Sequence, residues 1–299
     1  MVENKSKRIY LSALAILLYT CIFYFGACTE PEEGCIDVLA SNFELDTDID
    51  CCRDEDEECC CTFPSLTLNL IYKLNEMDTL GDAMTNFRLG EFYALENGLD
   101  SIRVDSFLFF VSKVEGVEDN NTDTLRVLET FNVTELNAEG ESEVMSFQDN
   151  IALINMQSFQ FILGTYRSEI DINQVNFNIG LDETIAEINP SDVQSDHPLS
   201  NEYATLFNSI SMRYMTGRTG FTIRRAGEDR AVVEDVIFSG NQVNSLSSPL
   251  FINKGRVLPI IMRINVLDVF KGIIFDLPSE DIGPIINENL TSTISILDE

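Results

Sequence analysis

The chain has no tryptophan and only one histidine, His197, among its 299 residues. One imidazole cannot supply the set of histidine ligands that most zinc and copper centres use. It would also have to be the general base of any Ser-His-Asp or Cys-His arrangement, and the sequence contains no nucleophile-elbow motif and no glycine-rich phosphate loop. These absences predict a protein that is not an enzyme.

Basic residues are scarce as well. The sequence has 19 Lys and Arg against 50 Asp and Glu, which gives a formal net charge of −31. A surface this acidic is repelled by nucleic-acid phosphates and by anionic membrane surfaces. We therefore expect no nucleic-acid partner. With so many acids, no single carboxylate pair stands out as hydrolytic machinery.

The N-terminus has a basic start and then a nearly uncharged apolar run that ends in FGAC at positions 25–28. This is the pattern of a secretory signal, and its last four residues resemble a bacterial lipobox. We expect residues 1–27 to be removed and Cys28 to carry a lipid that anchors the protein in the outer membrane. The alternative is an uncleaved membrane helix, because the run is almost long enough to span a bilayer.

No cysteine follows residue 61, but a short acidic stretch that ends there contains six: Cys35, Cys51, Cys52, Cys59, Cys60 and Cys61. An even number of cysteines in an oxidising compartment favours disulfides. Since adjacent cysteines seldom bond to each other, we expect the two clusters to cross-pair and Cys35 to join one of the last three. A thiolate metal site is the alternative, although Cys-x₂-Cys spacing is absent.

Residues 28–61, which we call the collar, are too poor in large apolar side chains to fold without cross-links or ions. Its candidate calcium ligands fall on positions 1, 3, 5, 9 and 12 of an EF-hand-type loop: Asp46, Asp48, Asp50, Asp54 and Glu57. Cys51 stands at position 6, where glycine is needed for a left-handed backbone. This disfavours an EF-hand and leaves looser calcium binding open.

From residue 62 to 299 the sequence shows the two-residue alternation of half-buried strands. Leu66, Leu68 and Leu70 alternate with polar residues, and the same rhythm recurs at 175–179, 210–214 and 221–223. Longer β-rich runs at 103–114, 232–238 and 256–266 are separated by turn signals. This pattern predicts one all-β domain, an antiparallel β-sandwich of immunoglobulin-like or jelly-roll-like kind.

A short helix is expected at the C-terminus, starting after Pro284. The apolar residues that would share its face are Ile285, Ile286, Leu290, Ile294 and Leu297.

Two resemblances add to these patterns. In the collar, Gly34-Cys35-x-Asp37, a central Ala-x-Asn-Phe and a closing Cys61-x-Phe-Pro resemble a segment common in Bacteroidota envelope proteins, without its usual Asp-Gly-Ser. The acids directly after Cys28 resemble the tether that sends Bacteroidota lipoproteins to the cell surface. This implies a location on the outer face of the outer membrane, with its periplasmic face as the alternative.

From about residue 62 onward the chain resembles the MbnP family of copper-associated lipoproteins. The resemblance rests on the first strand (66–74), FFVSKV (109–114), VNFNIGLDETIAEINP (175–190), HPL (197–199), SISMRYMTGRTGFTIRRAG (209–227) and MRINVLDVF (262–270). It implies a β-sandwich, an association with di-haem cytochrome c peroxidase-like proteins and, in some members, a copper site.

Copper-binding members of that family use several histidines and an oxidised tryptophan. This chain has one histidine and no tryptophan. Its remaining candidate copper ligands are His197 and Met212, whose thioether suits Cu(I). The competing interpretations are an exposed loop histidine and a methionine packed in the core of a strand. We expect copper binding by the family's mode to be lost.

The sequence thus predicts a lipid-anchored envelope binding protein, accessory to copper handling beside a di-haem peroxidase-like protein or a TonB-dependent receptor. The alternative is a surface interaction or adhesion module of the same fold that has lost copper. Three short Asp-(Ser/Thr)-apolar sites resemble a Bacteroidota O-glycosylation sequon, so Thr79, Ser101 and Thr124 are candidate glycan carriers in exposed loops.

Overall fold

The computed structural model describes residues 31–52, 60–74, 86–95, 99–117, 124–126, 129–136, 141–167, 172–228, 231–250 and 254–297. The chain divides into two compact units, with the boundary between Thr62 and Phe63. The first unit contains the collar and the second contains the sandwich, one residue beyond the boundary expected from the sequence. Each unit is described by itself.

The collar is held together covalently. Its strands β1 (Glu33–Gly34) and β2 (Ile49–Asp50) pair in parallel, and disulfides join Cys35 to Cys61 and Cys51 to Cys60, with Cα–Cα distances of 5.0 and 5.7 Å. Only Gly34, Cys35 and Ala40 are buried in the part of the collar that the structure describes. The disulfides therefore take the place of a hydrophobic core, and both bonds agree with the expected cross-pairing.

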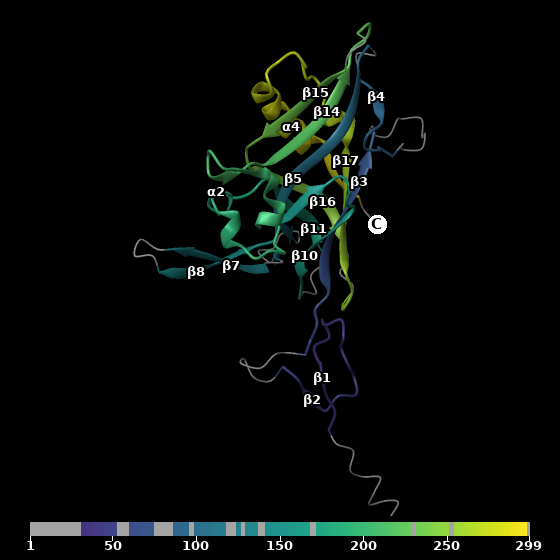
Figure 1. Ribbon diagram of the computed structural model, residues 1–299. Helices are drawn as coiled ribbons and strands as arrows, with labels where there is room; N and C mark the ends of the chain where they lie inside the picture. The colour runs from purple at the N-terminus through teal and green to yellow at the C-terminus, as the bar shows by residue number, and fades with distance from the viewer. Residues whose placement is uncertain are drawn as a thin grey trace, which may run out of the picture. The chain divides into compact units, whose positions relative to one another are not determined.

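The second unit is built on two sheets (Figure 1). The smaller has the order β10–β3–β17–β18: β10 (Gln160–Thr165), β3 (Ser65–Lys73), β17 (Leu258–Asn265) and β18 (Ile294–Leu297). The larger has the order β15–β14–β5–β11–β16: β15 (Val232–Phe238), β14 (Gly217–Arg224), β5 (Ser101–Val117), β11 (Ile172–Ile179) and β16 (Gln242–Leu250). Three further strands pair with β5: β4 (Phe92–Ala94), β6 (Thr124–Arg126) and β9 (Ala152–Asn155).

The remaining elements lie outside these sheets. Two hairpins are formed by β7 (Glu129–Leu136) with β8 (Ser142–Asp149), and by β12 (Phe207–Asn208) with β13 (Arg213–Tyr214). The helices among the described residues are α2 (Glu183–Ala186), α3 (Val266–Val269) and α4 (Ser279–Thr293), with 3₁₀ turns η1 (Pro190–Asp192) and η2 (Asn201–Leu206). Figure 1 shows the β7–β8 hairpin projecting from the side of the sandwich.

The core lies between the two sheets, as the alternating pattern predicted. Leu66, Leu68 and Leu70 of β3 are at most 3% exposed and belong to the same buried cluster as Phe107 and Phe109 of β5. Strand pairing is antiparallel in both sheets except between β3 and β17, which run parallel. The predicted all-β sandwich with a short C-terminal helix and an N-terminal disulfide-rich collar is confirmed.

Strand β5 contains two bulges that the sequence did not reveal. Asn176 pairs with Glu115 while Asn178 pairs with Ser112, so β5 has one extra residue between these two contacts. As a result Val111 and Val114 both join the core cluster, and Lys113 stays exposed. Without the extra residue, strict alternation would turn Lys113 toward the core. A second register shift lies near Asp105, against β14.

A third layer covers part of the larger sheet. Phe110, which points away from the main core, lies in a second buried cluster with Phe131, Leu199, Leu206 and Tyr214. The Tyr214 hydroxyl donates a hydrogen bond to the Leu199 carbonyl and ties the β12–β13 hairpin to the loop after η1. The consecutive apolar run of β5 is therefore buried on both faces.

The C-terminal helix differs from the prediction at both ends. It begins at Ser279, before Pro284, and ends at Thr293. Pro284 lies inside it, on the exposed side of the helix. Ile294 and Leu297 do not continue the helix but pair with Ile264 and Ile261 of β17. The free edge of β17 offers these residues backbone hydrogen bonds, and this long-range contact overrides the helical spacing.

Gly283 allows α4 to approach β15 closely. A Cβ atom at this position would lie 2.5 Å from the Ile237 carbonyl oxygen. Alanine normally favours a helix by about 1 kcal/mol over glycine. We nevertheless expect Gly283→Ala to lower the free energy of unfolding by about 1–3 kcal/mol, because the backbone contact cannot give way. Denaturant unfolding measures this, with Glu288→Ala on the exposed side of α4 as the control. A Gly283→Ala variant as stable as the parent would contradict the close approach.

Candidate functional site

His197 is half-buried in the loop after η1, not exposed as the sequence favoured. Its ring stacks on Phe131 of β7, with centroids 4.3 Å apart and planes inclined by 28°. Its Nδ1 atom accepts a hydrogen bond of 3.2 Å from the Leu199 backbone N–H. Because a neutral imidazole has one acceptor nitrogen, the ring proton resides on Nε2. Neither nitrogen offers a free lone pair to a metal in this arrangement.

Burial lowers the pKa of His197 from 6.5 to about 4, and Asp196 opposes this shift only in part. The fold thus favours the neutral ring, and stability is lost as pH falls from the unfolded pKa toward the folded one. Allowing for partial exposure, we expect a loss of about 1–2 kcal/mol between pH 7 and pH 5 from this residue.

His197→Phe keeps an aromatic ring against Phe131 and removes the titration. Since the chain has one histidine, urea unfolding of both proteins at pH 7 and pH 5 isolates the contribution of His197. An identical pH dependence of the two unfolding free energies would show that protonation of the ring is not linked to folding.

Met212 does not lie in a strand, and that prediction is wrong. It ends a turn of residues 209–212 with a left-handed φ of 52°, and it is 53% exposed. The turn forms because the Asn208 side chain accepts hydrogen bonds from the backbone N–H groups of Ile210 and Ser211. Short polar side chains of this kind favour turns over strands. Ile210, expected to face the core, is 94% exposed.

The other methionines near this hairpin do not complete a copper site either. Met215 follows β13, and its sulfur lies 3.9 Å from the Ser239 hydroxyl, which is a contact of hydrogen-bonding type. Met262 is buried in the main core within β17. In the described residues, no group of three His, Cys, Asp or Glu ligand atoms converges around His197 or Met212. The two candidate copper ligands are therefore not joined into a site there.

The predicted calcium ligands are only partly described. Asp46 and Asp48 are exposed, Asp50 is half-buried in β2 and accepts a hydrogen bond from the Cys52 N–H, and Asp54 and Glu57 lie outside the described residues. The one converging ligand group found in the described chain joins Asp50 to the sulfurs of Cys51, Cys52 and Cys61. These sulfurs are all in disulfides and supply no thiolate.

Several further predicted residues lie outside the described chain: Cys28, Cys59 and Thr79. Ser101 is the first residue of β5 and pairs with both Ala94 and Arg224, so it lies in a strand and not in an exposed loop. Thr124 begins β6, and its side chain is not among those described. Within the described ranges, none of the helices has the length and apolar character needed to span a membrane.

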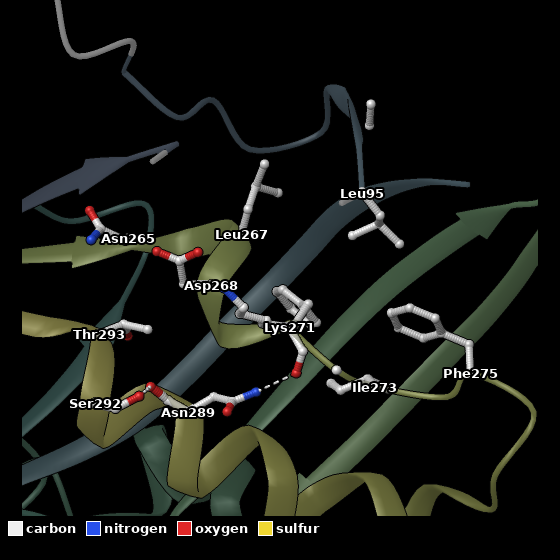
Figure 2. Close-up of a pocket in the computed structure, with 13 residues that line it drawn as sticks. Leu95, Asn265, Leu267, Asp268, Lys271, Ile273, Phe275, Asn289, Ser292 and Thr293 are labelled. Carbon is white, nitrogen blue, oxygen red and sulfur yellow. Dashed lines mark hydrogen bonds between the residues drawn. The ribbon is translucent and has the colours of Figure 1, made fainter. Parts of the chain in front are cut away.

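A pocket of about 850 Å³ lies beside the C-terminal helices (Figure 2). Leu95, Leu267 and Phe275 contribute apolar side chains to it, and Asn289 and Thr293 of α4 contribute polar ones. The Asn289 side-chain amide donates to the carbonyl oxygens of Val269 and Lys271, the second of these bonds being drawn in Figure 2. This amide satisfies carbonyls at the end of α3 and acts as a structural cap.

A second pocket, which we call the sheet-face pocket, has a volume of about 800 Å³ and is lined by polar side chains together with Val114, Phe177 and Val243. It lies on the face of the larger sheet opposite the core, because the polar lining residues of β11 alternate with the buried Val175, Phe177 and Ile179. Its side-chain amides come from β8, β11 and the residue before β16: Gln148, Gln174, Asn176, Asn178 and Asn241. Glu115, Lys113 and Asp182 add charged groups, and Ser245 adds a hydroxyl.

The polar groups of the sheet-face pocket are oriented by one another. Gln174 Nε2 donates to Asn176 Oδ1 at 2.8 Å, and Asn176 Nδ2 donates to Glu115 Oε1 at 3.3 Å. The Lys113 ammonium forms an ion pair with Asp182. The amides thus form a row of oriented hydrogen-bond donors and acceptors along β11. Beside this row, the charges of Lys113 and Asp182 cancel each other.

A buried clamp supports the edge of this pocket. Lys113 has a left-handed φ of 50°, and its backbone N–H donates to Asp149 Oδ1 at 2.9 Å. Asn150 binds both backbone groups of Val114, each at 2.7 Å. Asp149 and Asn150 are each 1% exposed, and burial raises the pKa of Asp149. The strained bulge is thus held by two fully buried side chains.

Sequence reasoning missed this site. The two-residue alternation predicts a strand at 175–179, but it does not indicate that the polar residues between the apolar ones line a pocket. One signal was available: asparagine is depleted in strands, and Asn176 and Asn178 stand two residues apart in a central strand of the sheet.

Comparisons of the chain with protein-family models, with curated proteins and with solved structures found no match. The functional assignment therefore rests on the residues and their geometry.

Proposed function

We propose that this chain is a non-catalytic binding module of the bacterial envelope, anchored by lipid on Cys28 and presenting its sandwich to a surface partner. The observation that supports it is the sheet-face pocket, whose fixed polar groups are suited to binding and include no imidazole or thiol. The cross-linked collar suits an exposed spacer, because disulfides keep it folded without a core.

Between the two functions that the sequence suggests, the geometry favours the interaction module over copper handling. The Nδ1 atom of His197 is occupied by Leu199, and Met212 stands exposed in a turn. Copper(I) and copper(II) titration of the lipid-free protein, with competing chelators, tests this. We expect no binding tighter than about 1 μM. Tight binding that disappears in both His197→Gln and Met212→Leu would restore the copper-handling function, with its di-haem or TonB-dependent partner.

Anchoring is tested in cells. Cys28→Ala is expected to abolish incorporation of labelled fatty acid and to release the protein from the membrane fraction. Protease treatment of intact cells then distinguishes the outer face of the outer membrane from its periplasmic face. Retention of the variant with an uncleaved N-terminus would support a membrane helix in place of the lipid.

A further inference from the structure

We infer that the sheet-face pocket binds a neutral, hydroxyl-rich ligand, an oligosaccharide. This inference rests on the proposed binding function and names its ligand class. Three kinds of observation support it: the composition of the floor, the charge balance, and the strained support beneath the edge.

The floor of the pocket departs from what a strand needs for stability. Gln174, Asn176 and Asn178 lie at alternate positions of β11 and share one face, about 7 Å apart. A sheet is served better by β-branched residues at such positions. Residues that break a local preference without an evident structural gain mark functional sites. An amide carries both donors and an acceptor, which is also true of the hydroxyl groups of a sugar.

The charges argue against other ligand classes. An anion would meet Glu115 and Asp182 in a chain of net charge −31. The one base of the pocket, Lys113, is already paired with Asp182. A bound cation needs several converging carboxylates, and in the described residues no three ligand atoms gather here. An apolar ligand would bury, without partners, the amide donors and acceptors that the bonds among Gln174, Asn176 and Glu115 do not use. A neutral polyol is the class that satisfies the donors and acceptors without opposing the charge.

The β5 bulge that supports the edge of the pocket has an unfavourable backbone conformation. Lys113 has a left-handed φ of 50°, which is unfavourable for a non-glycine residue, and the buried Asp149 and Asn150 hold it and Val114 in place. The result is that Lys113 and Glu115 lie on the same face as the β11 amides. A pocket of about 800 Å³ lies within the usual range of ligand sites.

The test uses the purified mature protein and named probes: cello-, manno-, xylo- and malto-oligosaccharides as neutral ligands, and oligogalacturonate as the acidic one. Isothermal titration is expected to show binding of at least one neutral oligosaccharide and none of oligogalacturonate. The inference is overturned if no neutral probe binds, or if the acidic probe binds more tightly. Binding only to a protein captured from cell extract would likewise overturn it in favour of a protein partner.

The informative variant is Asn176→Val, because valine suits a strand better than asparagine and cannot bind a hydroxyl group. We expect unchanged or increased stability and affinity for the bound oligosaccharide at least about tenfold lower, since two hydrogen-bonding groups are lost. The matched control is Asn132→Val, the same change on an exposed position of β7 that does not line the pocket. If Asn176→Val and the parent bound the oligosaccharide with equal affinity, the sheet-face pocket would not be its binding site.

This result is separable from the test of the proposed function. Copper titration reports on His197 and Met212, whereas sugar titration reports on Asn176. Tight copper binding therefore contradicts the proposed module alone, and absent sugar binding contradicts the ligand class alone.

Discussion

Replacing both cysteines of the Cys35–Cys61 disulfide by serine is expected to unfold the collar and to leave the sandwich intact. The two cysteines are 26 residues apart in the sequence. In the chain-entropy model, closing a loop of this length contributes about 3–4 kcal/mol to the free energy of unfolding. The described collar buries only Gly34, Cys35 and Ala40. The Cys51–Cys60 bond that remains closes a shorter loop, and the hydrogen bonds of the collar have no hydrophobic core behind them.

The measurement must resolve the two units. Hydrogen exchange of collar peptides and limited proteolysis report on residues before Thr62, and calorimetry reports mainly on the larger unit, Phe63–Glu299. The matched control replaces Cys51 and Cys60, whose bond has a separation of 9. Its shorter loop predicts a smaller loss, about 2.5–3 kcal/mol. A Cys35→Ser/Cys61→Ser collar with unchanged exchange protection would contradict this account.

Asn150→Ala is expected to be among the most destabilising single changes in the sandwich. The side chain accepts a hydrogen bond from the Val114 N–H and donates one to the Val114 carbonyl, both at 2.7 Å and both buried. Alanine leaves two buried backbone groups without partners, and each such group costs about 1–3 kcal/mol. The free energy of unfolding should therefore fall by about 2–5 kcal/mol.

Chemical denaturation at pH 7 measures this loss, and Asn132→Ala is the matched control. Asn132 is exposed and accepts a hydrogen bond from the Ser146 hydroxyl, so its replacement should change stability by less than about 0.5 kcal/mol. If Asn150→Ala were as stable as this control, the bulge would not depend on the clamp. A folded Asn150→Ala protein should also bind the oligosaccharide more weakly, because Lys113 and Glu115 would no longer be held beside β11.

Elements governed by local pattern were predictable. The alternation at Leu66, Leu68 and Leu70 predicted β3 and its buried face, since one face of a half-buried strand must be apolar. The pairing of Cys35 with the last cysteine cluster was also predictable, because adjacent cysteines are strained partners.

Elements that depend on distant partners were not predictable. The helix α4 stops at Thr293 because β17 pairs with the next residues. Of the strand expected at 210–214, residues 210–212 lie in a turn, because the Asn208 side chain bonds the backbone, and Arg213–Tyr214 form β13. The half-burial of His197 required Phe131, which lies 66 residues earlier in the sequence and belongs to the β7–β8 hairpin.

The candidate site shows the same division. That β11 alternates apolar and polar residues is visible in the sequence, but its polar row becomes a pocket only beside Glu115, Asp182 and Gln148. The register that places Glu115 next to Asn176 results from the extra residue at the β5 bulge. The sequence around the bulge does not predict it, because the residues that hold it in place, Asp149 and Asn150, lie more than 30 residues away in the sequence.

The six clustered cysteines, the acidic composition and the two-residue alternation after residue 62 were enough to determine a cross-linked collar followed by an all-β domain. These features are local or compositional, and their physical consequences do not depend on which strands become neighbours. Tertiary structure alone decided that Lys113 remains on the surface and that the amides of β11 line a pocket. It also decided that the His197 ring stacks on Phe131 and accepts a hydrogen bond from the Leu199 N–H. Each of these depends on strand register and long-range packing, where a shift of one residue reverses which face a side chain occupies.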